Sequence, residues 1–255
     1  MRVVSLVPSL TETIVYFGLI DTLVARTRYC VEPPGLIDRV EAVGGTKNPD
    51  VHRVVKLQPD LVVVSGEENR PRDVEFFRRA GLRLFLTHPR GVEEAAAMLE
   101  ELALVLGAGE AGSELAARCR RAIGRARQNR DSRARPRAFC PIWRRPWMTF
   151  SRRTYIGDML SLAGGCNVFA ESDRGDYFEV NLAEVAAARP EIILFPDEPY
   201  AFDQGHAVEL AAAGLRATPV FVDGKDLSWY GPRIPRAIGN LGRTLSAAGG
   251  QRAAD

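Results

Sequence analysis

The sequence predicts an α/β protein with two similar lobes, each built on a central, mostly parallel sheet, joined by a single long rigid α-helix. Three observations lead to this fold class. Short β-rich runs alternate with helical stretches in both halves of the chain, as in βαβ units. A helical region without a strand, at residues 92–129, separates the halves. A helix, a proline-acid turn and an apolar strand occur on each side of that region, at residues 50–64 and 181–195.

The first half of the chain shows the βαβ alternation most clearly. Residues 61–65 read LVVVS, which is typical of a parallel strand buried on both faces. Ser9, followed three residues later by Glu12, predicts a capping box at the start of the first helix. Strands are expected at residues 2–7, 23–25, 61–65 and 82–86, and helices at residues 10–17, 50–57 and 73–80.

Two helices are expected in the middle of the chain, at residues 92–106 and 110–129, with a glycine-containing break between them. A helix of about twenty residues is about 30 Å long at a rise of about 1.5 Å per residue, enough for a stiff connector. The sequence therefore predicts an N-terminal lobe at residues 1–108, a connecting helix at residues 109–130 and a C-terminal lobe at residues 131–255.

The second half resumes the alternation of strands and helices. Its proline-acid turn aligns with the earlier one without a gap, so that Pro59 matches Pro190 and Asp60 matches Glu191. A repeated unit on both sides of a long helix favours two similar lobes. Strands are expected at residues 137–142, 192–195 and 220–222, and helices at residues 154–162, 182–188, 207–212 and 235–246.

Composition and charge exclude several classes of protein. Of the 255 residues, 46% are hydrophobic and 26% are charged, which excludes a mainly disordered or coiled-coil chain. The 34 basic and 32 acidic residues leave a net charge of +2, which gives no electrostatic reason to expect nucleic acid as the main partner. No apolar run approaches the roughly 20 residues that a membrane helix needs, so membrane insertion is not expected.

The cysteines and the first residues bear on the compartment. The four cysteines form no CxxC pair, so neither a structural zinc site nor a disulfide framework is expected. The opening RVVSLVP leads directly into the first predicted strand and lacks the apolar core of a signal peptide. The sequence as written therefore predicts a cytoplasmic protein, and a periplasmic location is the alternative if a leader has been removed.

Five segments carry a resemblance to a known family. They are RVVSLVPSLTETIVYFGL near the start, VGGTKNPD with the following VHRVVKLQPDLVVV, LAGGCNVFA, PDEPYAF, and KDLSWYGPRIPRAIGNL near the end. Their order and their spread over nearly the whole chain resemble the class III substrate-binding proteins of ABC importers, the helical-backbone metal receptor superfamily. The motifs TKNPD, EENR, PIWRRPWMTF, DEPY and DLSWYGPR are most similar to a cobalamin-binding branch that lacks a signal peptide.

The resemblance implies two lobes on one rigid helix, with the ligand in a cleft between the lobes. It implies that this ligand is cobalamin (vitamin B12), haem or a ferric siderophore. It also implies an ABC permease as partner, with one surface glutamate on each lobe for docking. Glu68 and Glu198 lie near the expected docking positions. The alternative for both is hydrogen bonding in the cleft, to the ligand or to Arg70 and Arg233.

Loops that leave the carboxyl ends of the parallel strands are expected to line the cleft. All three tryptophans, Trp143, Trp147 and Trp229, fall in such loops. Their rings would grip a flat macrocycle by apolar contact, and the alternative is packing inside the lobes. Arg144 would pair with a carboxylate or phosphate of the ligand, or would be solvated. The expected ligand-binding residues are Tyr29, Cys30, Glu67, Asn69, Trp143, Arg144, Trp147, Tyr200, Trp229 and Tyr230.

Direct coordination of a metal in the ligand would involve Cys30 or His206, because thiolate and imidazole suit cobalt and iron. The alternative for Cys30 is the common one for a free cysteine, a small buried hydrophobic residue. We expect the other three cysteines to pack in the lobes.

The sequence contains no catalytic constellation. It has no GxSxG elbow, no GxxxxGK(S/T) phosphate loop and no GxGxxG after a strand. It therefore predicts a monomeric, non-enzymatic protein that requires no cofactor and binds a cobalamin-like corrinoid or related metal complex. Such a protein would act as the substrate-binding protein of an ABC transporter or as a cytosolic carrier. The alternative is a cytosolic enzyme or accessory protein that acts on a corrinoid or another small ligand.

Overall fold

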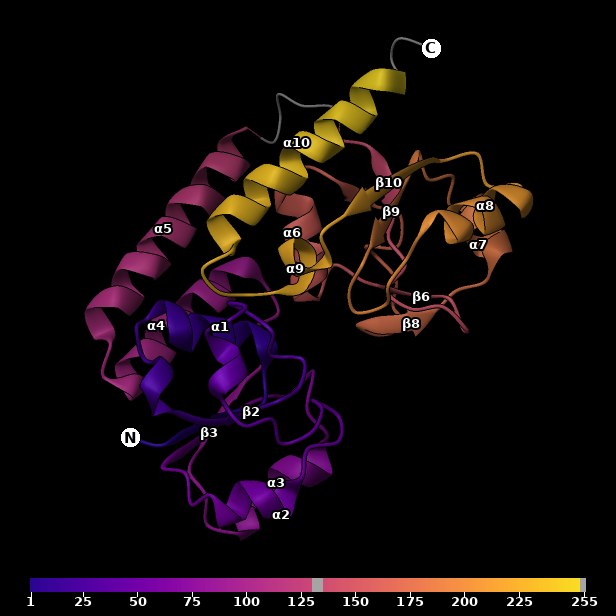
Figure 1. Ribbon diagram of the computed structural model, residues 1–255. Coiled ribbons are helices and arrows are strands. Elements are labelled where there is room, and N and C mark those ends of the chain that lie inside the picture. Colours follow the sequence, from indigo (N-terminus) through magenta and orange to yellow (C-terminus); the bar gives the residue numbers. More distant parts are fainter. Residues whose placement is uncertain (130–134, 253–255) are drawn as a thin grey trace. The chain divides into compact units, whose positions relative to one another are not determined.

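The computed structural model describes residues 1–129 and 135–252 (Figure 1). The chain divides into two compact units. Unit 1 comprises Met1–Pro89, Ala95–Ala117 and Tyr230–Pro232. Unit 2 comprises Arg90–Glu94 and the described parts of Arg118–Trp229 and Arg233–Asp255. The boundaries predicted from the sequence stay a prediction, and the one between residues 130 and 131 lies outside the described residues.

Unit 1 is built on a four-stranded parallel sheet in the order β2-β1-β3-β4. Every residue of β3 is buried, as its LVVVS sequence predicts. Figure 1 shows α1 and α4 on one side of this sheet and α2 and α3 on the other. The strands are β1 (Val3–Ser5), β2 (Leu23–Arg26), β3 (Leu61–Ser65) and β4 (Leu84–Thr87), and the helices are α1 (Pro8–Tyr16), α2 (Val51–Lys56), α3 (Pro71–Arg79) and α4 (Val92–Leu106), with short 3₁₀ turns η1 (Ile20–Thr22) and η2 (Ile37–Arg39).

Unit 2 repeats this sheet, because its four parallel strands follow the order β10-β9-β5-β7. A separate antiparallel ribbon is formed by β6 and β8. The strands are β5 (Arg137–Phe139), β6 (Met148–Phe150), β7 (Cys166–Asn167), β8 (Tyr177–Glu179), β9 (Ile192–Pro196) and β10 (Thr218–Val222). The helices are α6 (Tyr155–Leu162), α7 (Leu182–Ala187), α8 (Gln204–Ala212), α9 (Gly224–Ser228) and α10 (Ile234–Arg252).

The long helix α5 (Gly109–Gln128) is continuous, and its residues are divided between the two units at position 117/118. The structure therefore confirms the predicted fold class of two parallel-sheet lobes with one long helix. None of the helices in the described part of the chain has the length and apolar character needed to cross a bilayer.

The repeated helix–turn–strand segments have the same local structure. Asp50 and Asn181 cap α2 and α7 by accepting from a backbone N–H in the first turn. At the turn that follows, Gln58 and Arg189 both have φ of 47°. In each segment, the acidic residue that follows this turn, Asp60 or Glu191, binds the backbone of a neighbouring strand.

Each acid fixes the start of the neighbouring strand. Asp60 accepts from the backbone N–H of Arg2 at 2.6 Å, and Glu191 accepts from that of Arg137 at 2.7 Å. The alignment of Asp60 with Glu191 therefore reflects one structural role, which sets the register of β1 on β3 and of β5 on β9.

The predicted capping box at Ser9 is wrong. Helix α1 begins two residues earlier than expected, at Pro8, with Val7 as its N-cap and no side-chain cap. Proline suits the first helical position because its φ is already near the helical value and its missing N–H would have had no partner there. Ser9 therefore lies inside the helix, and its buried hydroxyl has no hydrogen-bond partner among the described residues.

Candidate functional site

The loops after β5 and β9 form an aromatic cluster in unit 2. Trp143 is 45% exposed, and its ring meets that of Tyr200 edge to face with centroids 5.4 Å apart. The Tyr200 hydroxyl lies 3.3 Å from Nε2 of His206, whose Nδ1 lies 2.8 Å from Oδ1 of Asp203. The structure therefore brings Trp143 and Tyr200 together, on a polar support formed by His206 and Asp203.

Arg144 is held by an acidic partner that lies far away in the sequence. Its guanidinium forms a two-pronged ion pair with Glu209 of α8, with Nε 3.1 Å from Oε2. Hydrogen bonding from Arg144 lowers the pKa of the Glu209 carboxyl. In this structure the planar fork of Arg144 is matched to a protein carboxylate, and its pairing with a ligand stays a prediction.

Trp147 has the packing role that was the alternative for the tryptophans. It is 7% exposed and stacks on Phe202, with centroids 5.9 Å apart and planes 6° from parallel. Its carbonyl accepts from the N–H of Val180, which fixes the turn that ends at Trp147 to the adjoining β6–β8 ribbon. The ring lies in a core cluster with Phe139, Phe178 and Phe195. Such burial leaves almost no ring surface for a ligand.

Trp229 is buried at the end of α9, a short helix where the sequence predicts a loop. Its indole N–H donates to Oε2 of Glu198 at 2.9 Å. The cationic groups of Lys225 and Arg233 lie 5.5 and 5.2 Å from the centre of its ring. Trp229 therefore fixes the loop after β9 through Glu198 and is not an exposed platform.

Glu198, predicted as a docking residue, is half-buried beside Trp229. Burial raises the pKa of its carboxyl, and the hydrogen bond from Trp229 lowers it by less. The carboxylate is thus used inside unit 2, in a position where its charged form is disfavoured.

We expect this burial to make stability fall as pH rises through the titration of Glu198. Between the usual glutamate pKa of about 4.3 and the raised value, the folded protein holds a proton that the unfolded chain releases. The contribution is therefore present at low pH and is lost above the raised pKa. Glu198→Gln keeps an oxygen acceptor for Trp229 and removes the titration. The unfolding temperature of the wild type, relative to this variant, should decrease between pH 4.5 and 7. A constant difference would contradict the assignment.

In unit 1, Tyr29 is the exposed aromatic side chain of the site. It is 52% exposed, and the guanidinium of Arg28 lies 5.2 Å from its ring centre. The adjacent Cys30 is fully buried, with Sγ 3.0 Å from the Thr11 hydroxyl and 3.2 Å from that of Thr27. The exposed Tyr29 and the buried Cys30 therefore have different roles, although both were predicted to contact the ligand.

Asn69 is buried, and its side chain forms hydrogen bonds with the backbone of unit 1. Its oxygen accepts from the N–H of Ser65 at 2.7 Å, and its nitrogen donates to the carbonyls of Leu6 and Thr46. It joins the segments after β1 and β3 and the loop before α2, so its role is to position them. Glu67 and Glu68 beside it are half-buried, and the Lys47 ammonium donates to the Glu67 carbonyl at 2.7 Å.

Tyr230 completes the set of predicted residues and is 2% exposed. Its hydroxyl lies 3.3 Å from Oγ of Ser65, the last residue of β3. Tyr230 is therefore part of the interior of unit 1, and its side chain offers little surface to a ligand.

Cys30 and His206 both have hydrogen-bond partners in this structure, and their coordination of a metal in the ligand stays a prediction. Burial raises the pKa of the Cys30 thiol, which favours the protonated form rather than the thiolate that binds metals. Both ring nitrogens of His206 face a partner, Asp203 on one side and Tyr200 on the other. Within residues 1–129 and 135–252, no three His, Cys, Asp or Glu side chains are grouped so that they could hold a metal ion.

Three residues that stabilise this region were missed, namely Phe202, Asp203 and Glu209. The spacing of Asp203 and His206 could have been found, since an N-cap acid with a polar residue three positions later is the pattern of a capping box, which the structure contains. The pair of Arg144 with Glu209 joins residues 65 positions apart and has no local signal.

Relatives of known name match most of the chain. A vitamin B12-binding protein of Yersinia pestis (strain Pestoides F) is 29% identical over 238 residues, which cover 93% of this chain and 82% of the relative. A vitamin B12-binding protein of Vibrio cholerae serotype O1 (strain M66-2) is 28% identical, over 85% of this chain and 77% of the relative.

Solved structures of similar proteins cover nearly the whole fold. The periplasmic vitamin B12 binding protein of Vibrio cholerae has a TM-score of 0.81 and 25% identity, and the match covers 97% of each chain. A periplasmic heme-binding protein in complex with two hemes has a TM-score of 0.83 and 27% identity, over 97% of this chain and 98% of the other.

The family comparison agrees with the predicted class of non-enzymatic binding protein. The sequence profile of a family described as "Periplasmic binding protein" matches residues 3–209, which is more than three quarters of the 255 residues. Together with the two parallel sheets of the same strand order, this match identifies the family: the chain is a member of the periplasmic binding protein family.

Proposed function

We propose that this protein binds a cobalamin-like corrinoid, or a related metal complex such as haem, without catalysing a reaction on it. The observation that carries the proposal is the similarity to vitamin B12-binding proteins over 85–93% of the chain. A heme-binding protein of similar fold, at 27% identity, supports the wider class of planar metal macrocycles.

Exposed aromatic side chains support the same class of ligand. Trp143 and Tyr29 each keep about half of their surface accessible, and Tyr200 lies against Trp143. A corrin or porphyrin has large apolar faces, which aromatic rings cover at a low cost in side-chain entropy. We assign ligand contact to these three residues. Trp147, Trp229, Tyr230, Asn69 and the Arg144–Glu209 pair then act as the structural support of the loops.

The proposal is tested by titrating the purified full-length chain with cyanocobalamin, hemin and a ferric siderophore. Calorimetry and the visible spectrum of each compound report binding. We expect a Kd below about 100 μM, or about −5.5 kcal/mol, for at least one of them. If none binds more tightly than this, the metal-complex class is excluded.

Partner and location follow from the same proposal. We infer an ABC permease as partner of a monomeric binding protein, with Glu68 and Glu198 as docking residues. Glu68 fits this role better, since Glu198 is used by Trp229. The related proteins of known structure are described as periplasmic, which supports that location against the cytoplasmic one expected from the sequence. Fractionation of native cells with an antibody to the chain distinguishes the two.

A further inference from the structure

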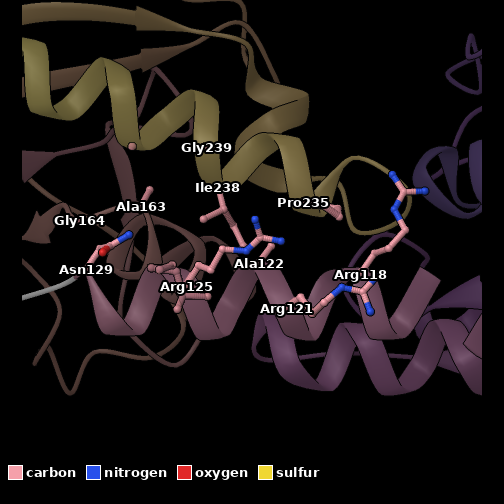
Figure 2. A pocket seen from close by; sticks show the side chains of 13 residues that line it. Arg118, Arg121, Ala122, Arg125, Asn129, Ala163, Gly164, Pro235, Ile238 and Gly239 are labelled. Carbon is pink, nitrogen blue, oxygen red and sulfur yellow. The ribbon is translucent and has the colours of Figure 1, made fainter. Parts of the chain in front are cut away.

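A groove with a volume of about 530 Å³ lies within unit 2, and its lining includes none of the candidate site residues. It is lined by α5, by the end of α6 and by the first turns of α10. Figure 2 shows α5 along one side of the groove and α10 along the other, with the guanidinium of Arg125 between them. The volume is in the range of about 300–1,000 Å³ that holds small organic ligands.

The charged side chains that line the groove in the described part of the chain are all positive. Arg118, Arg121 and Arg125 line it from α5, where spacings of three and four residues place side chains on one helix face. Among the residues that the structure describes, no acidic side chain lines it. These arginines contribute +3, whereas the whole chain carries 34 − 32 = +2, so the rest of the chain is close to neutral. The groove is therefore a local concentration of positive charge.

The arginines of α5 fall into two groups with different partners. Arg120 and Arg127, which do not line the groove, both pair with Glu93, at 3.7 and 3.5 Å. Arg121 and Arg125 are exposed and form no ion pair with any residue in the described ranges. Their planar guanidinium groups keep their donors for an external anion.

Apart from Asn129, the remaining lining residues are apolar and leave room. Ala122 and Ala126 come from α5, Ala163 from the end of α6, and Ile238 from α10. Gly239 of α10 has no side chain, and a Cβ added there would meet only the Arg243 guanidinium, at 3.6 Å. An organic ring can therefore lie on this floor while its acidic groups reach the arginines.

We propose that this groove binds an organic phosphate of nucleotide size. Arg121 and Arg125 are about 6 Å apart along the helix axis, and their long side chains can reach neighbouring phosphoryl groups. Guanidinium forks match phosphate oxygens with paired hydrogen bonds. The apolar floor adds affinity for a ring, which an inorganic anion lacks. The site is independent of the corrinoid proposal, because none of its lining residues is a candidate ligand-binding residue.

Three probes separate these contributions by calorimetry on the full chain at low salt. ADP carries both ring and phosphates, pyrophosphate only the phosphates, and adenosine only the ring. We expect ADP to bind at least tenfold more tightly than either of the others. If ADP fails to bind below 1 mM, or if pyrophosphate or adenosine binds as tightly as ADP, the proposal is overturned.

Matched variants locate the site. Arg121→Gln with Arg125→Gln should weaken ADP binding at least tenfold. Arg120→Gln with Arg127→Gln removes the same charge from the same helix outside the groove and should leave the affinity within twofold. Gly239→Met fills the floor with a good helix former and should also cost at least tenfold. Circular dichroism and cyanocobalamin titration should not change in any variant. Equal loss in both arginine pairs would reduce the effect to net charge and overturn the groove as the site.

Discussion

Trp147→Ala is expected to lower the free energy of unfolding by about 3–5 kcal/mol, the usual cost of removing a buried tryptophan. The ring is 7% exposed and stacks on Phe202 in the core of unit 2. The guanidinium of Arg144 also lies over this ring, 4.7 Å from its centre. Truncation would leave a cavity among aromatic side chains and release the loop that presents Trp143. For a protein stable by about 5–15 kcal/mol this loss is large.

Urea denaturation monitored by circular dichroism measures the effect as a shift of the unfolding midpoint. Trp147→Phe is the matched control, because it retains an aromatic ring against Phe202 and should lose much less stability. Should Trp147→Ala unfold at the wild-type urea concentration while binding ligand poorly, the ring would belong to the ligand site and the packing role would be wrong.

The main elements of the fold could be predicted because their signals are local. The helix at residues 92–106 is found with the same bounds, and the strand at residues 61–65 likewise. Hydrophobic periodicity over 15 residues, or a continuous apolar run between two turn signals, is sufficient for such elements. The aligned Asp60 and Glu191 also predicted correctly that the two lobes are similar, since both fix a strand by the same hydrogen bond.

The role of Trp147 could not be predicted because its structure is made by distant residues. Strands β6 and β8 have three residues each and pair across a separation of about thirty positions. A strand of three residues is too short to show the alternation of apolar and polar side chains that marks a strand. In addition, Trp147 follows Arg144, Arg145 and Pro146, which are typical of a loop. The flanking residues indicate a turn, which the structure contains, but the burial of the Trp147 ring depends on its stacking against the distant Phe202.

The same limit applies to the electrostatic contacts. Arg144 pairs with Glu209 across 65 positions, and Trp229 donates to Glu198 across 31 positions. The residue type shows that an arginine can bind a carboxylate, but it does not show which carboxylate lies near it in the folded chain. We assign ligand contact to three aromatic residues because of their surroundings. Tyr29 and Trp143 are exposed, and Tyr200 contacts the exposed ring of Trp143.

Trp143→Ala is expected to weaken the binding of cyanocobalamin, or of whichever metal complex binds, by about thirtyfold, or 2 kcal/mol, the size typical of an aromatic anchor. Its effect on folding should be small. Trp143 is 45% exposed and makes an edge contact with Tyr200. Substitutions at exposed positions usually change stability by about 0.5 kcal/mol, and loss of an aromatic pair adds up to about 1 kcal/mol. Binding and stability should therefore separate in this variant, whereas they fall together in Trp147→Ala.

Calorimetric titration and urea denaturation of the same preparations test this separation. Trp143→Phe keeps a ring in the same position and should retain most of the affinity, which distinguishes loss of an apolar face from loss of the residue in general. Normal binding by both Trp143 variants, in a protein that binds the ligand, would remove Trp143 from the site and leave the corrinoid proposal intact. Because Trp143 and Tyr200 are in edge contact, their alanine variants should also be coupled, so that the double variant loses less affinity than the two single losses combined.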